Sequence, residues 1–212
     1  MQHQVDATAS AASNWETAAV TALLIAVARR LNHEPQAAPA FAAHDPVTGL
    51  TSRVAMEEQA AAMFAAARAA EAPMSVILVD VDGLKAINTT LGVAAGDAVL
   101  AHVAKLMAIN IQPGVDLAAR HAGAQMMLVL PEADFAWASR FAERLRGTLA
   151  NRPLHHAGQM IETSACFGLA SITPADSCFA DLVGRAQKAL DVAKTGGPNR
   201  VRVAAGQDLA AA

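Results

Sequence analysis

Apolar positions along the chain follow two spacings, which together predict a domain of alternating strands and helices. Short runs of β-branched and aliphatic residues predict strands, and apolar residues three and four apart predict helices. In chain order, the pattern predicts a helix over 52–70, a strand over 74–81, a helix over 94–109, strands over 116–121 and 126–130, a helix over 133–150, a strand over 161–172, a helix over 179–194 and a strand over 200–203. The core order β-α-β-β-α-β predicts a ferredoxin-like α/β (α+β) fold, with a central antiparallel sheet flanked by helices.

This order also predicts where a functional site lies. The first two strands are joined through a helix, so a right-handed crossover makes them parallel. The end of the first strand, with Asp80 and Asp82, and the hairpin over 122–125 therefore fall on the same edge of the sheet. We expect the function of the fold at that edge.

The segment before the domain has a different character. Residues 1–13 show no period and are expected to be disordered. Residues 14–32 are predicted to form a helix with one apolar stripe, which consists of Val20, Leu23, Leu24, Val27 and Leu31. A linker with two prolines follows over 33–44, then the domain over 45–204 and a tail over 205–212. A lone helix of this length is marginal in water, so we expect residues 14–31 to self-associate or, as the alternative, to fold back onto the domain.

Composition and charge exclude several classes of partner. The 212 residues carry 16 basic and 19 acidic side chains, a net charge of −3, which provides no electrostatic surface for nucleic acid or an anionic membrane. The longest apolar run, over 18–28, is shorter than the roughly 20 residues of a membrane span. Acidic residues precede it, so a signal peptide is not expected and the chain is expected to be cytoplasmic. Cys166 and Cys178 lack metal-type spacing and are expected to be free thiols.

The carboxylates at the end of the first strand are the first candidates for chemistry. Asp80 and Asp82 end a buried strand and are followed by Gly83 and Lys85. Hard cations such as Mg²⁺ prefer oxygen ligands together with substrate phosphates. The residues alone leave two interpretations open, a metal site and a solvated strand end with an ordinary turn.

Four motifs in order resemble the GGDEF family of diguanylate cyclases. Residues 45–50 (DPVTGL) resemble the family's DPLTGL motif, and residues 80–88 (DVDGLKAIN) are similar to its D-x-D-x-F-K-x-x-N segment. Residues 96–97 (GD) follow at the family distance, and Lys194 with residues 199–201 (NRV) resembles its C-terminal motif. The matches extend over most of the chain, so the resemblance is specific.

The resemblance implies a reaction and a role for each matched position. Two domains, each with a bound GTP, would meet face to face and form cyclic di-GMP with the help of two metal ions. By position, the metal ligands would be Asp80 and the carbonyl of Val81, the guanine contacts Asn88 and Asp97, and the phosphate contacts Gly83, Leu84, Lys85 and Lys194. The residues themselves also allow Asn88 to be a helix or turn cap and Asp97 to be a helix N-cap.

The signature hairpin departs from the family pattern. Where the family reads GGDEF, this chain reads Ala122, Gly123, Ala124, Gln125 and Met126. Ala124 replaces the second metal carboxylate, Gln125 replaces the next acid, and Ala122 adds a methyl group where the nucleotide approaches. Losing even about 4 kcal/mol of transition-state stabilisation slows a reaction roughly a thousandfold.

We therefore expect a degenerate, catalytically inactive domain with a regulatory or protein-interaction role in cyclic di-GMP signalling. The alternatives are an allosteric GTP-binding domain and a divergent active diguanylate cyclase. No cofactor is expected to be required, and Mg²⁺ is expected only if GTP still binds.

Other family positions have also changed. Pro198 stands where the family has a phosphate-binding arginine four residues after Lys194, and Val93 stands in place of a histidine. The RxxD site of product-inhibited cyclases is replaced by residues 113–116 (PGVD), which keep Asp116 but lack the arginine. Without this bidentate phosphate contact, a receptor site for cyclic di-GMP is not expected.

Overall fold

The computed structural model describes residues 43–205. The predicted disorder over 1–13, the helix over 14–32 and nearly all of the linker over 33–44 lie outside the described residues, as does the tail after position 205. Within residues 43–205, no helix combines the length and the apolar character that a membrane crossing requires.

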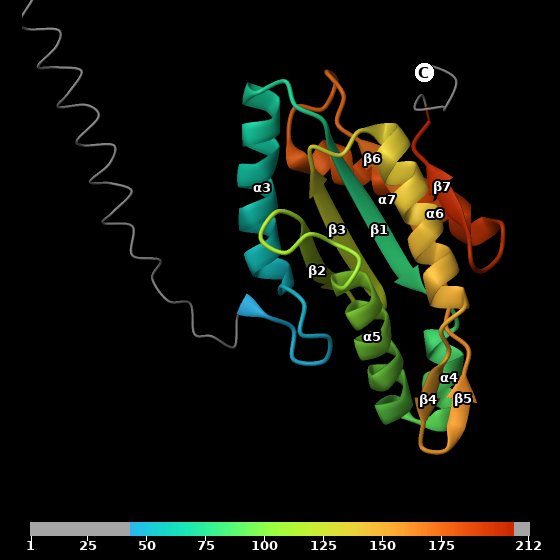
Figure 1. The fold of residues 1–212 in the computed structure, drawn as a ribbon. Coiled ribbons are helices and arrows are strands. Elements are labelled where there is room, and N and C mark those ends of the chain that lie inside the picture. Colours follow the sequence, from blue (N-terminus) through green and yellow to red (C-terminus); the bar gives the residue numbers. More distant parts are fainter. Residues whose placement is uncertain (1–42, 206–212) are drawn as a thin grey trace, which may run out of the picture. The chain divides into compact units, whose positions relative to one another are not determined.

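The described residues form one five-stranded sheet with helices on both of its faces (Figure 1). The elements are α3 (Arg53–Ala69), β1 (Met74–Val81), α4 (Leu84–Leu91), α5 (Val93–Ala108), β2 (Leu117–Ala122), β3 (Gln125–Pro131), α6 (Phe135–Ala150), β4 (Leu154–His156), β5 (Gln159–Ile161), β6 (Ala165–Ser171), α7 (Phe179–Thr195) and β7 (Val201–Val203). The strand order is β2-β3-β1-β6-β7, and β4 with β5 forms a separate hairpin. All neighbours in the large sheet are antiparallel except β6 and β7, which are parallel. The expected mixed α/β fold with a mostly antiparallel sheet is confirmed.

The central strand β1 supplies both layers of the hydrophobic core. Its residues alternate between the two faces, as the pleat of a strand requires. Ile77 and Val79 belong to the cluster with α5 and α6, whereas Val76 and Leu78 belong to the cluster with α3 and α7. All four side chains are fully buried, so β1 is covered by helices on both faces.

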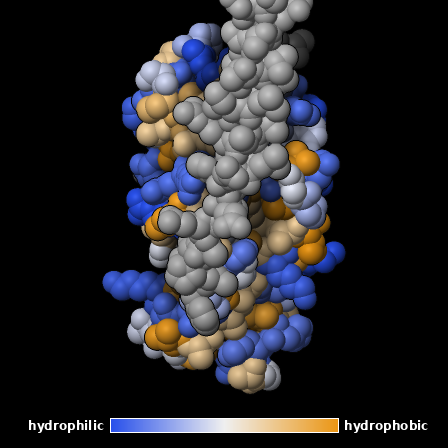
Figure 2. Space-filling model, turned by 90° about the vertical axis from the view of Figure 1, so that its left-hand side faces the viewer, coloured by the Kyte–Doolittle hydropathy of each residue, from blue (hydrophilic) through white to orange (hydrophobic). Residues whose placement is uncertain are grey.

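The exposed side of α3 is mixed, because charged residues of its first turns stand beside the exposed Val54 and a series of exposed alanines. Its N-terminal turns expose Arg53, Glu57 and Glu58, and Arg53 Nε lies 2.8 Å from Glu57 Oε1. On the face of the molecule shown in Figure 2, the coloured residues mix hydrophilic with hydrophobic side chains. Buried residues of α3, such as Met56 and Phe64, pack instead against the sheet.

Helix α7 lies unusually close to strand β6, and Gly168 permits this approach. A Cβ atom at Gly168 would lie 2.3 Å from the carbonyl oxygen of Ala186 and 2.4 Å from the amide nitrogen of Leu190. Real Cβ atoms do not approach backbone atoms so closely, and therefore only glycine fits here.

The predicted strand over 161–172 is wrong in its first part. The structure divides this region into β5, which ends at Ile161, and β6, which begins at Ala165. Between them, the buried Thr163 hydroxyl donates to the carbonyl of Leu149 at 3.1 Å, which draws the chain out of the sheet. The β4–β5 hairpin was not predicted, and its turn residues Ala157 and Gly158 have φ of +49° and +78°, as in a two-residue type I′ turn.

A second difference concerns the segment after β1. The sequence predicted a helix only from position 94, but the structure has a separate helix, α4, over Leu84–Leu91. Two of the predicted phosphate contacts, Leu84 and Lys85, lie in its first turn, and their role stays a prediction. Gly92, at φ +89°, then separates α4 from α5. The side chain of Leu84 packs against the core, so only its backbone remains free to meet a ligand.

Candidate functional site

The end of β1 meets the β2–β3 hairpin, as the crossover rule predicted. Both β1 and β2 are antiparallel to β3, which lies between them, so β1 and β2 point in the same direction. Asp80 pairs in register with Gln125, and the amide of Val81 donates to the carbonyl of Ala124 at 3.3 Å. The hairpin residues therefore stand directly beside the predicted metal carboxylate.

Asp80 forms an ion pair with Lys194, the basic residue in the last turn of α7. The Lys194 Nζ atom lies 2.8 Å from Asp80 Oδ2, and the Asp80 side chain is only 13% exposed. The sequence predicted these residues to serve separate parts of a nucleotide site, a metal ion and a phosphate. In this structure the ammonium group instead neutralises the carboxylate.

Asp82 has a different set of partners. Its Oδ2 atom accepts a hydrogen bond from the Ser164 hydroxyl at 2.7 Å and another from the backbone amide of Asn199 at 2.8 Å. Asn199 has φ of +56°, and its contact with Asp82 fixes the loop between α7 and β7. Asp82 is thus a structural link, and Asp80 is the carboxylate at the end of β1 that faces Lys194.

Asn88 and Asp97 lie on consecutive helices, α4 and α5. The Oδ1 atom of Asn88 is buried and has no hydrogen-bond partner among the described residues. Gly96 makes room for it, since a Cβ atom at Gly96 would lie 1.7 Å from Asn88 Oδ1. The side chain of Asn88 therefore does not act as a cap. Asp97 lies inside α5, whose N-cap is Gly92, so the N-cap alternative for Asp97 is wrong.

Arg120 fixes the conformation of the β2–β3 hairpin. Its Nε and Nη2 atoms donate to the carbonyl of Gly123 at 3.0 and 2.6 Å, and its Nη1 atom lies 3.2 Å from Asp45 Oδ1. Asp45 also accepts hydrogen bonds from the amide and hydroxyl of Thr48. Burial opposes ionisation of Asp45, but the hydrogen bonds from Thr48 and the nearby Arg120 outweigh it and lower the pKa of this carboxyl group. Arg120 was not among the predicted site residues, although a basic residue just before a hairpin is a visible signal.

The donor groups at this edge do not fit a two-metal site. Asp80 already pairs with Lys194, Asp82 is held by Ser164 and Asn199, and Ala124 has no side-chain oxygen. Across positions 43–205, no group of three or more His, Cys, Asp or Glu side chains is placed to hold a metal ion. Two dications would lack the negative charge that they require.

The space beside the start of α4 is poor in positive charge. A cavity of about 640 Å³ there is lined by ten residues, including Gly83, Pro198 and Asn199. Two of the lining residues are acids, Asp82 and Glu162, and none of the ten is Lys or Arg. Lys85 is exposed on α4 and does not line this cavity. Of the four predicted phosphate contacts, only Gly83 lines this cavity.

Known proteins with similar sequences support the motif assignment. The family described as diguanylate cyclase, GGDEF domain, matches residues 42–200. The response regulator PleD of Caulobacter vibrioides is 31% identical over 163 residues, which are 76% of this chain and 36% of PleD. Diguanylate cyclase A of Treponema denticola is 34% identical over 128 residues, which are 60% of this chain and 34% of that protein. The chain therefore spans about a third of the length of these relatives.

Solved structures share the fold. The GGDEF domain of DgcB from Caulobacter crescentus, crystallised with cyclic di-GMP, superimposes with a TM-score of 0.74 at 26% identity, covering 77% of this chain and 94% of that domain. The active GGEEF domain of a diguanylate cyclase from Vibrio cholerae gives a TM-score of 0.68 at 30% identity, covering 73% of this chain and 97% of that domain.

Proposed function

The chain belongs to the GGDEF domain family of diguanylate cyclases, and on that premise we propose that it is a catalytically inactive member with a regulatory or protein-interaction role in cyclic di-GMP signalling. The observation that carries the proposal is the pair of side chains at the hairpin. Ala124 stands beside Val81, and the neutral Gln125 pairs with Asp80. The fold has kept the place of the catalytic loop without its acidic groups.

The missing acids matter because of the charge that the reaction develops. Attack of a hydroxyl group on a phosphate places negative charge on the phosphate oxygens, which metal ions neutralise. The metal ions in turn need carboxylates that hold them in place. With Ala124 and Gln125 at the hairpin, Asp80 would be the only one of these carboxylates left to hold them. Every tenfold loss of rate corresponds to only about 1.4 kcal/mol of transition-state stabilisation.

The ion pair between Asp80 and Lys194 supports the same proposal. A metal ion at Asp80 would have to displace an ammonium group that lies 2.8 Å from its carboxylate. The net charge of the pair is zero, so it offers a dication much less attraction than two carboxylates would.

The test is a search for the product. The full chain is incubated with GTP and either Mg²⁺ or Mn²⁺, and the nucleotides are separated by chromatography, with an active GGDEF domain as the positive control. We expect no cyclic di-GMP. Formation of cyclic di-GMP that disappears in the Asp80→Ala variant would refute the proposal, because the product would then come from this site.

A second candidate function, allosteric GTP binding, is favoured by one observation. The buried Oδ1 atom of Asn88 has no partner within the described part of the chain, and an unpaired buried polar atom is costly unless a ligand satisfies it. Asp97 directly follows Gly96, the residue that lies against Asn88 Oδ1, and its side chain is half-buried. Calorimetric titration with GTP, repeated with ATP and with the Asn88→Ala variant, tests this candidate independently of turnover.

Self-association is also part of the proposal. Residues 14–31 carry the apolar stripe that the sequence predicts for a helix, and they lie outside the described residues. We infer that this segment joins two copies of the chain or docks on a partner protein.

A further inference from the structure

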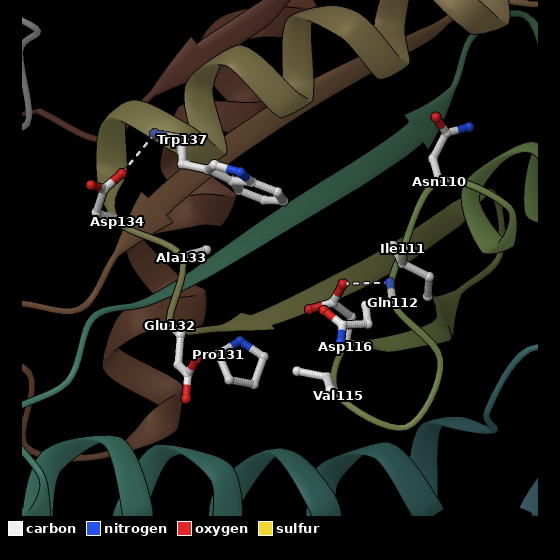
Figure 3. A pocket seen from close by; sticks show the side chains of 10 residues that line it. All are labelled: Asn110, Ile111, Gln112, Val115, Asp116, Pro131, Glu132, Ala133, Asp134 and Trp137. Atoms are coloured by element: carbon white, nitrogen blue, oxygen red, sulfur yellow. Dashed lines mark hydrogen bonds between the residues drawn. The ribbon is translucent and has the colours of Figure 1, made fainter.

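A pocket lies at the opposite end of β3 from the degenerate hairpin. It has a volume of about 490 Å³ and opens between the loop that follows α5 and the turn that joins β3 to α6 (Figure 3). The hairpin begins β3 at Gln125, whereas Pro131, the last residue of β3, lines the pocket. The pocket is therefore separate from the nucleotide edge.

The side chain of Trp137 dominates one wall of this pocket. The ring stacks on the buried Phe141, with centroids 5.1 Å apart and planes 11° from parallel, yet Trp137 is 42% exposed. Figure 3 shows the indole extending over the space between α6 and the loop that carries Asp116. Val115, which lines the pocket from that loop, is 41% exposed and adds an apolar surface at its mouth. An aromatic ring held firmly on one face and open elsewhere is suited to contact a flat partner group.

Three carboxylates line the same pocket as the indole, and no cationic side chain lines it. Asp116, Glu132 and Asp134 line the pocket, and none of its ten lining residues is Lys, Arg or His. None of the three forms an ion pair with a residue from 43 to 205, whereas Asp45, Asp80 and Asp176 each have one.

Two of these acids accept hydrogen bonds from backbone amides rather than from a cation. Asp116 accepts from the Gln112 amide at 2.7 Å, and Asp134 accepts from the Trp137 amide at 2.7 Å as the N-cap of α6. Burial raises the pKa of Asp116 and the hydrogen bond from Gln112 opposes this change, as expected of a partly buried carboxylate with no cation beside it.

We propose that this pocket binds an arginine side chain from a basic segment of a partner protein. A guanidinium group is planar, stacks on an indole and pairs with carboxylates, so it matches both the aromatic wall and the acidic rim. The exposed apolar side chain of Val115 would contact the partner beside the arginine. The inference rests on the proposed interaction role and names the chemistry of the partner. The negative phosphates of cyclic di-GMP would be repelled by these carboxylates, and the arginine of the RxxD motif that would hold them is absent.

The test uses the intrinsic fluorescence of Trp137 in the full chain. The probe is a short peptide with two arginines separated by leucine, and the control peptide carries citrulline, which keeps the shape of arginine but has no charge. We expect a saturable fluorescence change with the arginine peptide and about tenfold weaker binding of the citrulline peptide, because both the cation–π contact and the ion pairs are lost. The Trp137→Phe variant, which retains Trp15, must lose the signal.

Two matched variants distinguish the pocket from the general charge of the protein. Glu132→Gln removes one charge from the pocket, and Glu58→Gln removes one from the exposed side of α3, where Glu58 has no ion pair among the described residues. We expect about threefold weaker binding for Glu132→Gln and no change for Glu58→Gln.

Four outcomes would overturn the inference. The citrulline peptide could bind as tightly as the arginine peptide, or Glu132→Gln and Glu58→Gln could change binding equally. Cyclic di-GMP could compete with the arginine peptide, or the fluorescence could change with protein concentration alone, which would assign the pocket to a second copy of the chain. None of them depends on turnover of GTP, so the inference and the proposed inactivity can fail separately.

Discussion

Replacing Gly168 with alanine should test the close approach of α7 to the sheet. The new Cβ atom would lie 2.3 Å from the Ala186 oxygen and 2.4 Å from the Leu190 nitrogen, both of which belong to the backbone of α7. These atoms cannot rotate away, so the helix must retreat from β6 by about 1 Å to reach ordinary contact distance. Retreat loosens the packing of the buried Leu182, Ala186 and Leu190 against the sheet. We expect the free energy of unfolding to fall by about 3 kcal/mol, the upper end of the range for overpacked cores.

The matched control is the same substitution at Gly184, which lies in α7 itself. A Cβ atom there would meet nothing within 4 Å, so Gly184→Ala adds no clash and gains helix propensity. We expect it to raise the free energy of unfolding by about 0.5–1 kcal/mol. For a domain of this size, 1 kcal/mol corresponds to roughly 2–4 °C in the melting temperature. Urea and thermal unfolding followed by circular dichroism measure both changes. A free energy of unfolding for Gly168→Ala within about 1 kcal/mol of that of the natural protein would refute the reasoning.

Three further predictions concern GTP affinity, self-association and the pH dependence of stability. GTP should bind more weakly than micromolar by calorimetry even if Asn88 still contacts guanine, since losing two charge-assisted contacts weakens binding by about several hundredfold. The full chain should form a larger species by light scattering at about 100 μM than a chain starting near residue 40, whereas equal masses would exclude residues 14–31 as the contact. Burial opposes ionisation of Asp176, but hydrogen bonds from Arg185 and Thr173 outweigh burial and lower the pKa of this carboxyl group. Ionised Asp176 therefore stabilises the folded domain above the unfolded pKa of about 3.9, and this contribution is lost as the pH falls through the lower pKa of the folded state. Asp176→Asn should therefore destabilise the domain at pH 7 by about 3 kcal/mol and reduce the loss of stability below pH 4, as urea titrations at pH 7 and 3 would report.

Much of the fold could be predicted because its main elements carry long and regular patterns. The β1 strand and the helices α6 and α7 lie within two residues of their predicted bounds. The short elements could not be predicted in the same way. Helix α4 begins at Leu84, and its N-cap, Gly83, has no side chain that could signal a helix start. The three-residue strands of the β4–β5 hairpin are too short for any period to appear.

The candidate site could be located but not fully assembled from the sequence. The crossover rule placed Asp80 beside the hairpin because it depends only on the order of the elements. The partner choices of the aspartates depend instead on how distant loops pack. Asp82 meets the amide of Asn199 across 117 positions of sequence, and Asp80 meets Lys194 at the far end of α7. No local pattern contains that information.

The two-way contact of Arg120 links the first turn of the domain to the hairpin mechanically. One guanidinium group holds the carboxylate of Asp45 and the carbonyl of Gly123, although Asp45 and Arg120 are 75 positions apart in the sequence. The same turn also joins the sheet directly, because His44 bridges to Thr51 and Thr51 bridges to Ala119 of β2. The start of the described domain, the edge strand and the hairpin tip therefore share one network of contacts. A substitution at Arg120 should loosen the hairpin tip and the first turn of the domain together.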